Sequence, residues 1–280
     1  MDIENAIQGL NDENVAVRKE AIEQLVNCKD KTIIDPLIKA VTDENAQVRF
    51  KAAEILGNFG DDALDKLITQ FESASGKNKR FFGFALKETG NPKVIEHFAE
   101  AVDDEDFGVR KVAIRGLGEL HAEEKLNSIA KGLEDDDWGV RLATVYALGD
   151  IATPASINLI KQARRKESEK DFKKSCNKAI KKAEKSLKAK ESGKTVSNTI
   201  PMSRIKEMEK TNLQKAIKEY EKYVTDEHPK HAPYKRLCVL YRKNNDYDNE
   251  IRVIKKAIEV LSSQNPGKEV FFQKRLDKMS

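Results

Sequence analysis

A short pattern recurs through the first two-thirds of this chain at a nearly constant spacing. In most copies a valine precedes an arginine, and a small residue follows three positions after the arginine. Successive copies are 31, 31, 30, 31 and 32 residues apart, beginning at Val17, Val48, Lys79, Val109, Val140 and Phe172. A fixed period of this size is typical of a stacked solenoid, in which each repeat contacts only its neighbours. Such a fold presents a long open surface, which favours a protein that holds a partner.

Each repeat is predicted to form two helices joined by an acidic turn. In the second repeat an apolar helix over 33–41 precedes the turn, and a second helix runs from Val48 to Leu56 and ends at Gly57. We expect an aspartate in the turn to cap the second helix, and an arginine six residues later to reach the carboxylate of its own or the neighbouring turn. The residues of this predicted ladder are Asp12 with Arg18, Asp43 with Arg49, Asp104 with Arg110, and Asp135 with Arg141.

The repeated pattern Leu-x-Asp-(Asp/Glu)-x-x-x-Val-Arg-x-x-Ala-x-x-x-Leu-Gly resembles HEAT repeats. The resemblance is to the short HEAT-like units of about thirty residues found in bilin-lyase-type and archaeal proteins. It implies an all-α superhelix over residues 1–190, with five repeats and a divergent, basic sixth. The third repeat departs from the pattern, because Ser73 to Lys77 contain no acidic residue.

The C-terminal part carries a different pattern. Tyr234, Leu237, Cys238, Tyr241, Tyr247, Ile254 and Ala257 fall at spacings that resemble a tetratricopeptide repeat, in which two antiparallel helices interlock. Glu250 departs from the alanine usual there. The resemblance implies a small helical module over 204–280, joined to the solenoid by a polar, turn-rich linker over 191–203.

Charge is divided unevenly along the chain. Residues 1–160 carry 19 Lys and Arg against 30 Asp and Glu, whereas residues 161–280 carry 32 against 17. Segment 161–190 alone holds 13 basic and 4 acidic residues. This excess predicts contact with RNA or a ribosome through phosphate neutralisation, although Phe172 is the only aromatic side chain there for base stacking. Opposite charge in the two halves also predicts head-to-tail self-association.

Motifs that carry chemistry are missing from the sequence. The four histidines form no His-Glu pair of the kind with which the HEAT-type deoxyhypusine hydroxylases bind iron, and no phosphate-binding loop, GxSxG or HExxH motif occurs. We therefore expect no catalytic residue, no metal and no cofactor. The longest apolar runs are shorter than the roughly 20 residues that span a bilayer, and the first residues lack the features of a signal peptide, so we expect a cytoplasmic protein without a membrane segment.

Two surfaces are candidate partner sites. Large side chains expected on the concave face, where second helices line a HEAT-like stack, predict a binding strip of Phe50, Phe81, Phe82, Arg115, Leu142 and Tyr146. The alternative is that the third repeat buries its own phenylalanines. In the C-terminal module, cations on one helix face predict a clamp for an acidic peptide, or else a solvated face, at Lys235, Arg242 and Lys243.

These features together predict a non-enzymatic adaptor that binds partner proteins on both surfaces. Two alternatives stay open: an RNA- or ribosome-associated factor anchored by the basic half, and a client-holding subunit of a bilin-lyase-like modifying enzyme.

Overall fold

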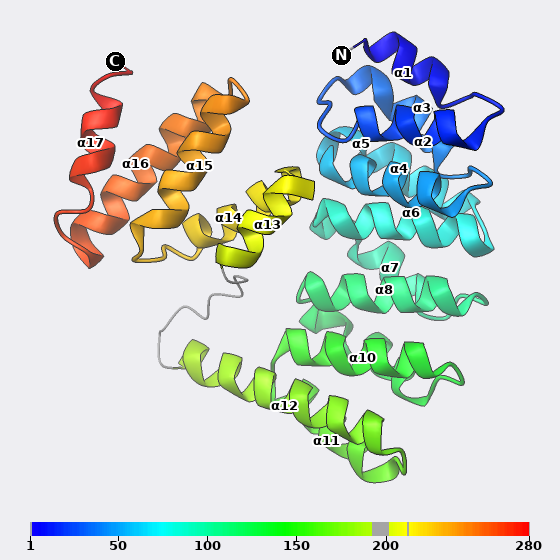
Figure 1. Cartoon of the computed structure of the whole chain (residues 1–280). Helices are drawn as coiled ribbons and strands as arrows, with labels where there is room; N and C mark the ends of the chain where they lie inside the picture. Colours follow the sequence, from blue (N-terminus) through cyan, green and yellow to red (C-terminus); the bar gives the residue numbers. More distant parts are fainter. Residues whose placement is uncertain (1, 192–201, 212, 280) are drawn as a thin grey trace. The chain divides into compact units, whose positions relative to one another are not determined.

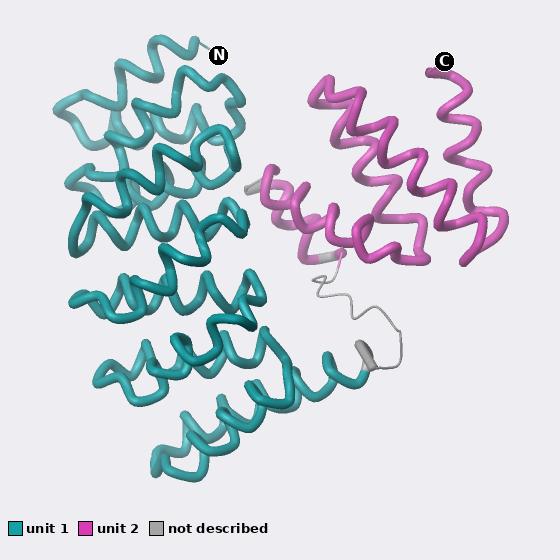
Figure 2. The backbone as a smooth tube through the Cα atoms, turned by 180° about the vertical axis from the view of Figure 1, so that it is seen from behind, with its two compact units in different colours: residues 1–192 teal, residues 193–280 magenta. Residues whose placement is uncertain are grey.

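The computed structural model describes residues 2–191, 202–211 and 213–279, which form helices and no strand (Figure 1). The chain divides into two compact units, unit 1 over residues 1–192 and unit 2 over residues 193–280 (Figure 2). The predicted linker over 191–203 lies largely outside the described residues. None of the described helices is long and apolar enough to cross a membrane.

Unit 1 is a stack of six helix pairs. The first helices are α1 (Ile3–Gly9), α3 (Ile34–Ala40), α5 (Asp61–Ser73), α7 (Ile95–Ala101), α9 (Leu126–Lys131) and α11 (Pro154–Lys166). The second helices are α2 (Val15–Gln24), α4 (Ala46–Asn58), α6 (Gly76–Thr89), α8 (Phe107–Glu119), α10 (Trp138–Ile151) and α12 (Lys170–Glu191). Short 3-10 turns cover Lys31–Ile33, Pro92–Val94, Glu123–Lys125 and Gly132–Glu134. Successive second helices pack directly on one another, and the structure is therefore an all-α solenoid (Figure 1).

The acidic turns begin the second helices in a way that differs from the prediction. The helix caps are Asn14, Asn45, Asp106 and Asp137, each of which accepts a backbone N–H of the first turn. The ladder aspartates lie two residues earlier and accept the backbone N–H of these caps, for example Asp43 from Asn45 at 2.7 Å. The expectation that Asp12, Asp43, Asp104 and Asp135 cap the helices is therefore wrong. Their short side chains close the turn before the helix instead.

Each ladder arginine ties its own turn to the helix that follows. Arg18 Nη1 donates to the carbonyl oxygens of Asp12 and Glu13 at 2.9 and 3.0 Å. The corresponding bonds hold the turns before Arg49, Arg110 and Arg141. Because a guanidinium carries several donors in a fixed fork, one side can bind the turn while the other reaches the next repeat.

Between repeats, two of the arginines bind carboxylates of the following turn. Arg18 Nε lies 2.7 Å from Asp43, and Arg110 contacts both oxygens of Asp135 at 2.7 and 2.8 Å. Where the third repeat lacks an acidic turn, the Arg49 guanidinium lies 5.1 Å from the centre of the Phe81 ring.

Small residues let successive second helices approach closely. A Cβ on Gly118 would lie 2.5 Å from the Cα of Ala147, and one on Gly149 would lie 3.2 Å from the Cβ of Ala179. Gly57 approaches Ala85 in the same way. Each glycine lies eight residues after its ladder arginine, so these contacts also fix how the repeats align.

This alignment shows that the third repeat is shifted by one residue. Ala85 matches Ala147 and Ala179 only if Lys79, not Arg80, takes the ladder position. Lys79 Nζ indeed lies 2.8 Å from Asp104, the carboxylate that a ladder residue should bind. The cause is the connection before α6, which consists of only Ala74 and Ser75.

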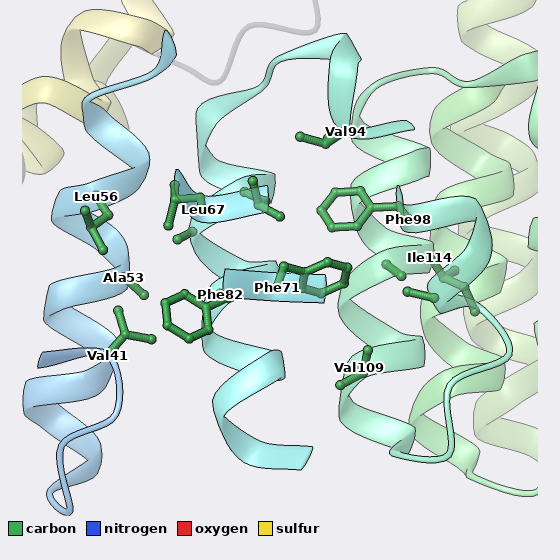
Figure 3. Packing of buried hydrophobic residues seen from close by; sticks show 14 of the residues in the cluster. Val41, Ala53, Leu56, Leu67, Phe71, Phe82, Val94, Phe98, Val109 and Ile114 are labelled. Atoms are coloured by element: carbon green, nitrogen blue, oxygen red, sulfur yellow. The ribbon is translucent and has the colours of Figure 1, made fainter. Parts of the chain in front are cut away.

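The core of unit 1 lies between the two layers of helices (Figure 3). Its largest side chains come from the middle of the stack, where Phe71 and Phe98 meet edge to face at 5.9 Å between ring centres. Phe82 is 1% exposed and occupies the position that Ala52 and Ala113 fill in neighbouring repeats. A large side chain fits there because Gly83 follows it against Phe71.

Unit 2 contains α13 (Met202–Thr211), α14 (Leu213–Thr225), α15 (His231–Lys243), α16 (Tyr247–Gln264) and α17 (Val270–Leu276). Its core includes Tyr220, Tyr234 and Phe272. The longest of these helices, α16, packs on α15, and α17 packs against α16. The resemblance of this unit to a tetratricopeptide repeat stays a prediction.

Candidate functional site

The exposed side of α2, α4, α6, α8 and α10 forms one continuous surface, which we call the second-helix face. Two columns of side chains follow from the corrected alignment. The position after the ladder residue holds Lys19, Phe50, Arg80, Lys111 and Leu142. One turn further on, the second column holds Glu23, Glu54, Phe84, Arg115 and Tyr146.

An aromatic pair lies in the middle of this face. Phe50 is 47% exposed, and its ring centre lies 5.0 Å from that of Phe84, on the next helix. Lys87 Nζ lies 5.3 Å from the centre of the Phe84 ring. Phe84 thus supports Phe50 while the outer face of Phe50 stays open to solvent.

Ion pairs run from this aromatic pair toward the C-terminal end of the stack. Lys87 binds Glu88 at 2.6 Å and Glu119 at 3.1 Å, and burial opposes its charge while these two carboxylates raise its pKa. Arg115 lies 5.9 Å from the centre of the Tyr146 ring. The ordered network crosses four helices through Lys87, Glu88, Glu119, Arg115, Asp150 and Lys182.

The predicted strip is only partly assembled in the structure. Leu142, Tyr146 and Arg115 are half-buried on the second-helix face, and Phe50 is exposed there. Phe82 was wrongly included, because it is a core residue, as the alternative of a self-burying third repeat required. Phe81 packs against Arg49 across the repeat junction. The sequence reasoning missed Phe84, since it aligned Arg80 rather than Lys79 with the arginines.

Phe107 and Trp138 lie at equivalent positions at the start of α8 and α10. Their exposed fractions are 42% and 41%. Phe107 is flanked by Arg80 and Lys111, at 4.5 and 5.9 Å from its ring centre, and Trp138 Nε1 donates to Glu169 at 2.9 Å. Both aromatics make local contacts along the turn edge while staying accessible.

The three predicted cations of unit 2 have different surroundings. Lys235 Nζ lies 4.8 Å from the centre of the Phe271 ring, and Lys243 is exposed. Arg242 Nε donates to Glu250 at 3.0 Å, and Glu250 is fully buried. Arg242 is therefore held in place within unit 2, whereas the two lysines remain accessible to a ligand.

Reactive groups do not converge in the part of the chain that the structure describes. No cluster of three or more His, Cys, Asp or Glu side chains suited to a metal is found among these residues. Burial raises the pKa of Cys176 to about 11 and that of Cys238 to about 12, which disfavours their thiolates at neutral pH. The described surface can bind through apolar and charged contacts.

Comparison with known protein families gives one match. The family model for HEAT repeats matches residues 3–79 and 95–181, which together make up more than half of the 280 residues. A comparison with curated protein sequences gives no match.

Solved structures of other proteins are similar to part of this chain. The complex of CpcE and CpcF of phycocyanin lyase from a Nostoc species aligns with a TM-score of 0.51 and 20% identity, covering 54% of this chain and 99% of that one. A designed armadillo repeat protein in complex with a (KR)4 peptide gives 0.43 and 17%, covering 65% and 100%. Human deoxyhypusine hydroxylase gives 0.35 and 20%, covering 65% and 84%. At these identities the likeness concerns the fold alone.

Proposed function

Because the chain belongs to the HEAT-repeat family, we propose that it is a non-catalytic, cytoplasmic scaffold that holds a partner protein on the second-helix face of unit 1. The observation that carries this proposal is the pair of Phe50 and Phe84. A large apolar group with 47% of its surface exposed lies outside the core and rests on a second aromatic ring. Exposed aromatic groups backed by packed neighbours are typical centres of protein interfaces.

The surroundings of this pair indicate the kind of segment it would bind. Phe50 offers a contact for an apolar side chain, while Lys87, Arg115 and the carboxylates paired with them lie toward one side. Because these charges already neutralise one another, a partner would gain little from net charge and more from an apolar anchor flanked by hydrogen-bonding groups. We infer a partner segment with one or two large apolar residues.

The test combines two substitutions with a matched control. Phe50→Ser with Phe84→Ser should reduce capture of the partner from a native lysate at least about tenfold, in line with the loss of an interface hot spot. Phe107→Ser changes an equally exposed phenylalanine on the turn edge and should leave capture unchanged. Thermal unfolding of both variants is compared with that of the parent chain. Equal capture by the double variant, with its fold intact, would refute this site.

Unit 2 supplies a second, independent surface. We propose that Lys235 and Lys243 bind carboxylates of an acidic peptide, with Arg242 fixed beside them by Glu250. Lys235→Glu with Lys243→Glu should weaken binding of a labelled acidic peptide and lower its salt dependence. Lys274→Glu with Lys278→Glu, also exposed lysines of unit 2, is the control of equal charge. Peptide binding that is the same in all three proteins would remove this surface from consideration.

Two other roles stay open as variants of the scaffold. If the held protein is the substrate of a modifying enzyme, as in a client-holding subunit, the captured partner should carry a covalent modification. If the partner is RNA or a ribosome, nuclease treatment should release the captured material. Capture that survives nuclease and yields an unmodified protein favours the adaptor.

A further inference from the structure

The ladder that joins the repeats ends in an unmatched charge at each end of unit 1. At three of the five junctions inside the stack, a ladder cation binds the aspartate six residues before the next ladder residue: Arg18 with Asp43, Lys79 with Asp104 and Arg110 with Asp135. By the same rule, Asp12 of the first turn would bind a cation of a preceding repeat. Lys173, the ladder residue of α12, would bind a carboxylate of a following repeat.

Both groups are accessible for such a contact. Asp12 is exposed and Lys173 is half-buried, and neither forms an ion pair within residues 2–191. Glu13 is exposed beside Asp12, at the position equivalent to Glu44, and Glu44 also binds Arg18, at 2.8 Å. A lysine placed like Arg18 would therefore lie between Asp12 and Glu13.

A second junction contact has the same complementarity. Inside the stack, Glu23 of α2 pairs with Lys51 of α4 at 3.7 Å. The position of Glu23 is taken in α12 by Lys178, and the position of Lys51 is taken in α2 by Glu20. At both positions the sign of the charge is reversed. If another copy of α2 packed on α12, Lys178 and Glu20 would therefore form the same ion pair with the two charges exchanged.

The first repeat also exposes an apolar group that a preceding repeat would cover. Val17 is 37% exposed, whereas its equivalents Val48, Val109 and Val140 are fully buried. In the structure α2 packs on one second helix, α4, whereas α4, α8 and α10 each pack between two. The exposed side of the first repeat is thus built like the interior surface of the stack.

The end formed by α12 is strongly basic. Five exposed lysines recur at helical spacing on the side away from the core: Lys174, Lys178, Lys181, Lys185 and Lys188. Lys181 takes the position that glycine holds at three tighter junctions. A lysine at this position is compatible with stacking. Lys87 holds the same position in α6 and forms an ion pair with Glu119 of the next second helix.

We propose that a second copy of this chain docks its first repeat on α12, so that unit 1 continues head to tail across molecules. Lys173 then lies between Asp12 and Glu13 of the partner copy, Lys178 meets Glu20, and Val17 is covered. This contact is heterologous, so each added copy presents the same two ends and the assembly stays open. A nucleic acid would satisfy the lysines but would leave Asp12, Glu13 and Val17 without a role.

The first experiment is sedimentation velocity of the full chain over a range of concentrations. At about 50 mM salt the average mass should rise with concentration, and at about 500 mM salt the rise should largely disappear, because exposed charges are screened. A chain that stays monomeric at low salt over the whole range overturns the proposal.

Charge reversal then identifies the two faces. Lys173→Glu with Lys178→Glu sets carboxylates against the acidic contacts Asp12, Glu13 and Glu20, and Glu13→Lys with Glu20→Lys sets lysines against Lys173 and Lys178 while leaving the turn closed by Asp12 intact. Each variant alone should associate at least about tenfold more weakly, since like charges oppose docking. A mixture of the two should associate again. The control, Lys255→Glu with Lys268→Glu, changes exposed lysines of unit 2 and should behave like the parent chain.

Three further results would overturn the proposal. Association unaffected by the reversals would place the contact elsewhere, and failure of the mixture to restore association would show that the two ends do not meet. If the chain is monomeric but the Lys173→Glu and Lys178→Glu variant loses binding to a labelled RNA duplex, α12 is a nucleic-acid surface instead. Thermal unfolding of every variant shows whether a loss of association reflects a loss of fold.

Discussion

The carboxylate of Glu250, which is fully buried in unit 2, accepts a hydrogen bond from Arg275 Nε at 2.7 Å. The other carboxylate oxygen accepts a hydrogen bond from Arg242 Nε at 3.0 Å. The Glu250 side chain on α16 therefore links α15 and α17. Arg275 also donates to the carbonyl oxygen of Cys238 at 3.2 Å. The position where a tetratricopeptide pattern has alanine is thus occupied by an acid with two partners.

Glu250→Gln should destabilise unit 2. The amide keeps the shape of the side chain but removes the charge that two guanidinium groups share, and a hydrogen bond to a charged group contributes about 1.5–3 kcal/mol. We expect a loss of roughly 2–3 kcal/mol, measured by denaturant unfolding. Glu259→Gln, on the exposed side of the same helix, should have little effect. Equal stability of the two variants would show that the buried carboxylate is not needed.

Gly118→Ala should destabilise unit 1. Its Cβ would lie 2.5 Å from the Cα of Ala147, so α8 and α10 must separate. Gly139→Ala is the control: its Cβ would first meet a carboxylate oxygen of Asp137 at 3.0 Å and the flexible Lys111 chain at 3.7 Å, and no backbone. The control should be neutral or more stable by up to about 1 kcal/mol, because alanine favours helix. The midpoint of thermal unfolding should therefore fall for Gly118→Ala and stay level or rise for Gly139→Ala.

Acid should weaken the junctions between repeats. A hydrogen bond from Arg110 holds the pKa of Asp135 below its usual range, and Arg80 does the same for Asp106. A carboxyl whose pKa is lowered by folding stabilises the fold above its unfolded pKa of about 3.9, and this contribution is lost as the pH falls through the folded pKa. The free energy of unfolding of the parent chain should fall below about pH 4, and that of Asp135→Asn should fall less. Parallel pH profiles would contradict this assignment.

The three cysteines should differ in reactivity. Burial raises the pKa of Cys176 to about 11 and of Cys238 to about 12, whereas Cys28 is half-buried near the surface of the first repeat. A thiol reagent at about pH 8 should modify Cys28 in the folded chain and the other two only in denaturant. Cys28→Ser should remove the reaction of the folded protein. Rapid reaction of that variant would show that a buried cysteine is accessible.

The repeat period and the solenoid were predictable from the sequence, because each Val-Arg element carries the same turn, core and junction contacts. The shift in the third repeat was not, since Lys79 and Arg80 are both cations and only the contacts with Asp104 and Ala85 distinguish them. With Lys79 in the ladder position, Phe82 falls at a core position and Phe84 at a surface position.

The role of Glu250 could not be predicted either. Its partner Arg275 lies 25 residues away on α17, and no local pattern connects the two. Sequence patterns indicate contacts within a repeat or contacts that recur at a fixed period. The contact of Glu250 joins three helices and occurs at one place in the chain, so no repeated pattern marks it.

The junction between the second and third repeats differs from its neighbours in the chemistry of its ladder contact. Arg49 meets the ring of Phe81 there, and an aromatic ring neither takes up a proton nor exchanges its partner for a salt ion. Acid should therefore weaken the ladder contacts of Arg18 with Asp43 and Lys79 with Asp104 and leave the contact of Arg49 with Phe81 unchanged. The other contacts of this junction, Lys31 with Asp62 and Lys66 with Asp35, remain sensitive to acid. At a pH where the neighbouring ladder contacts are protonated, the second and third repeats should thus keep theirs.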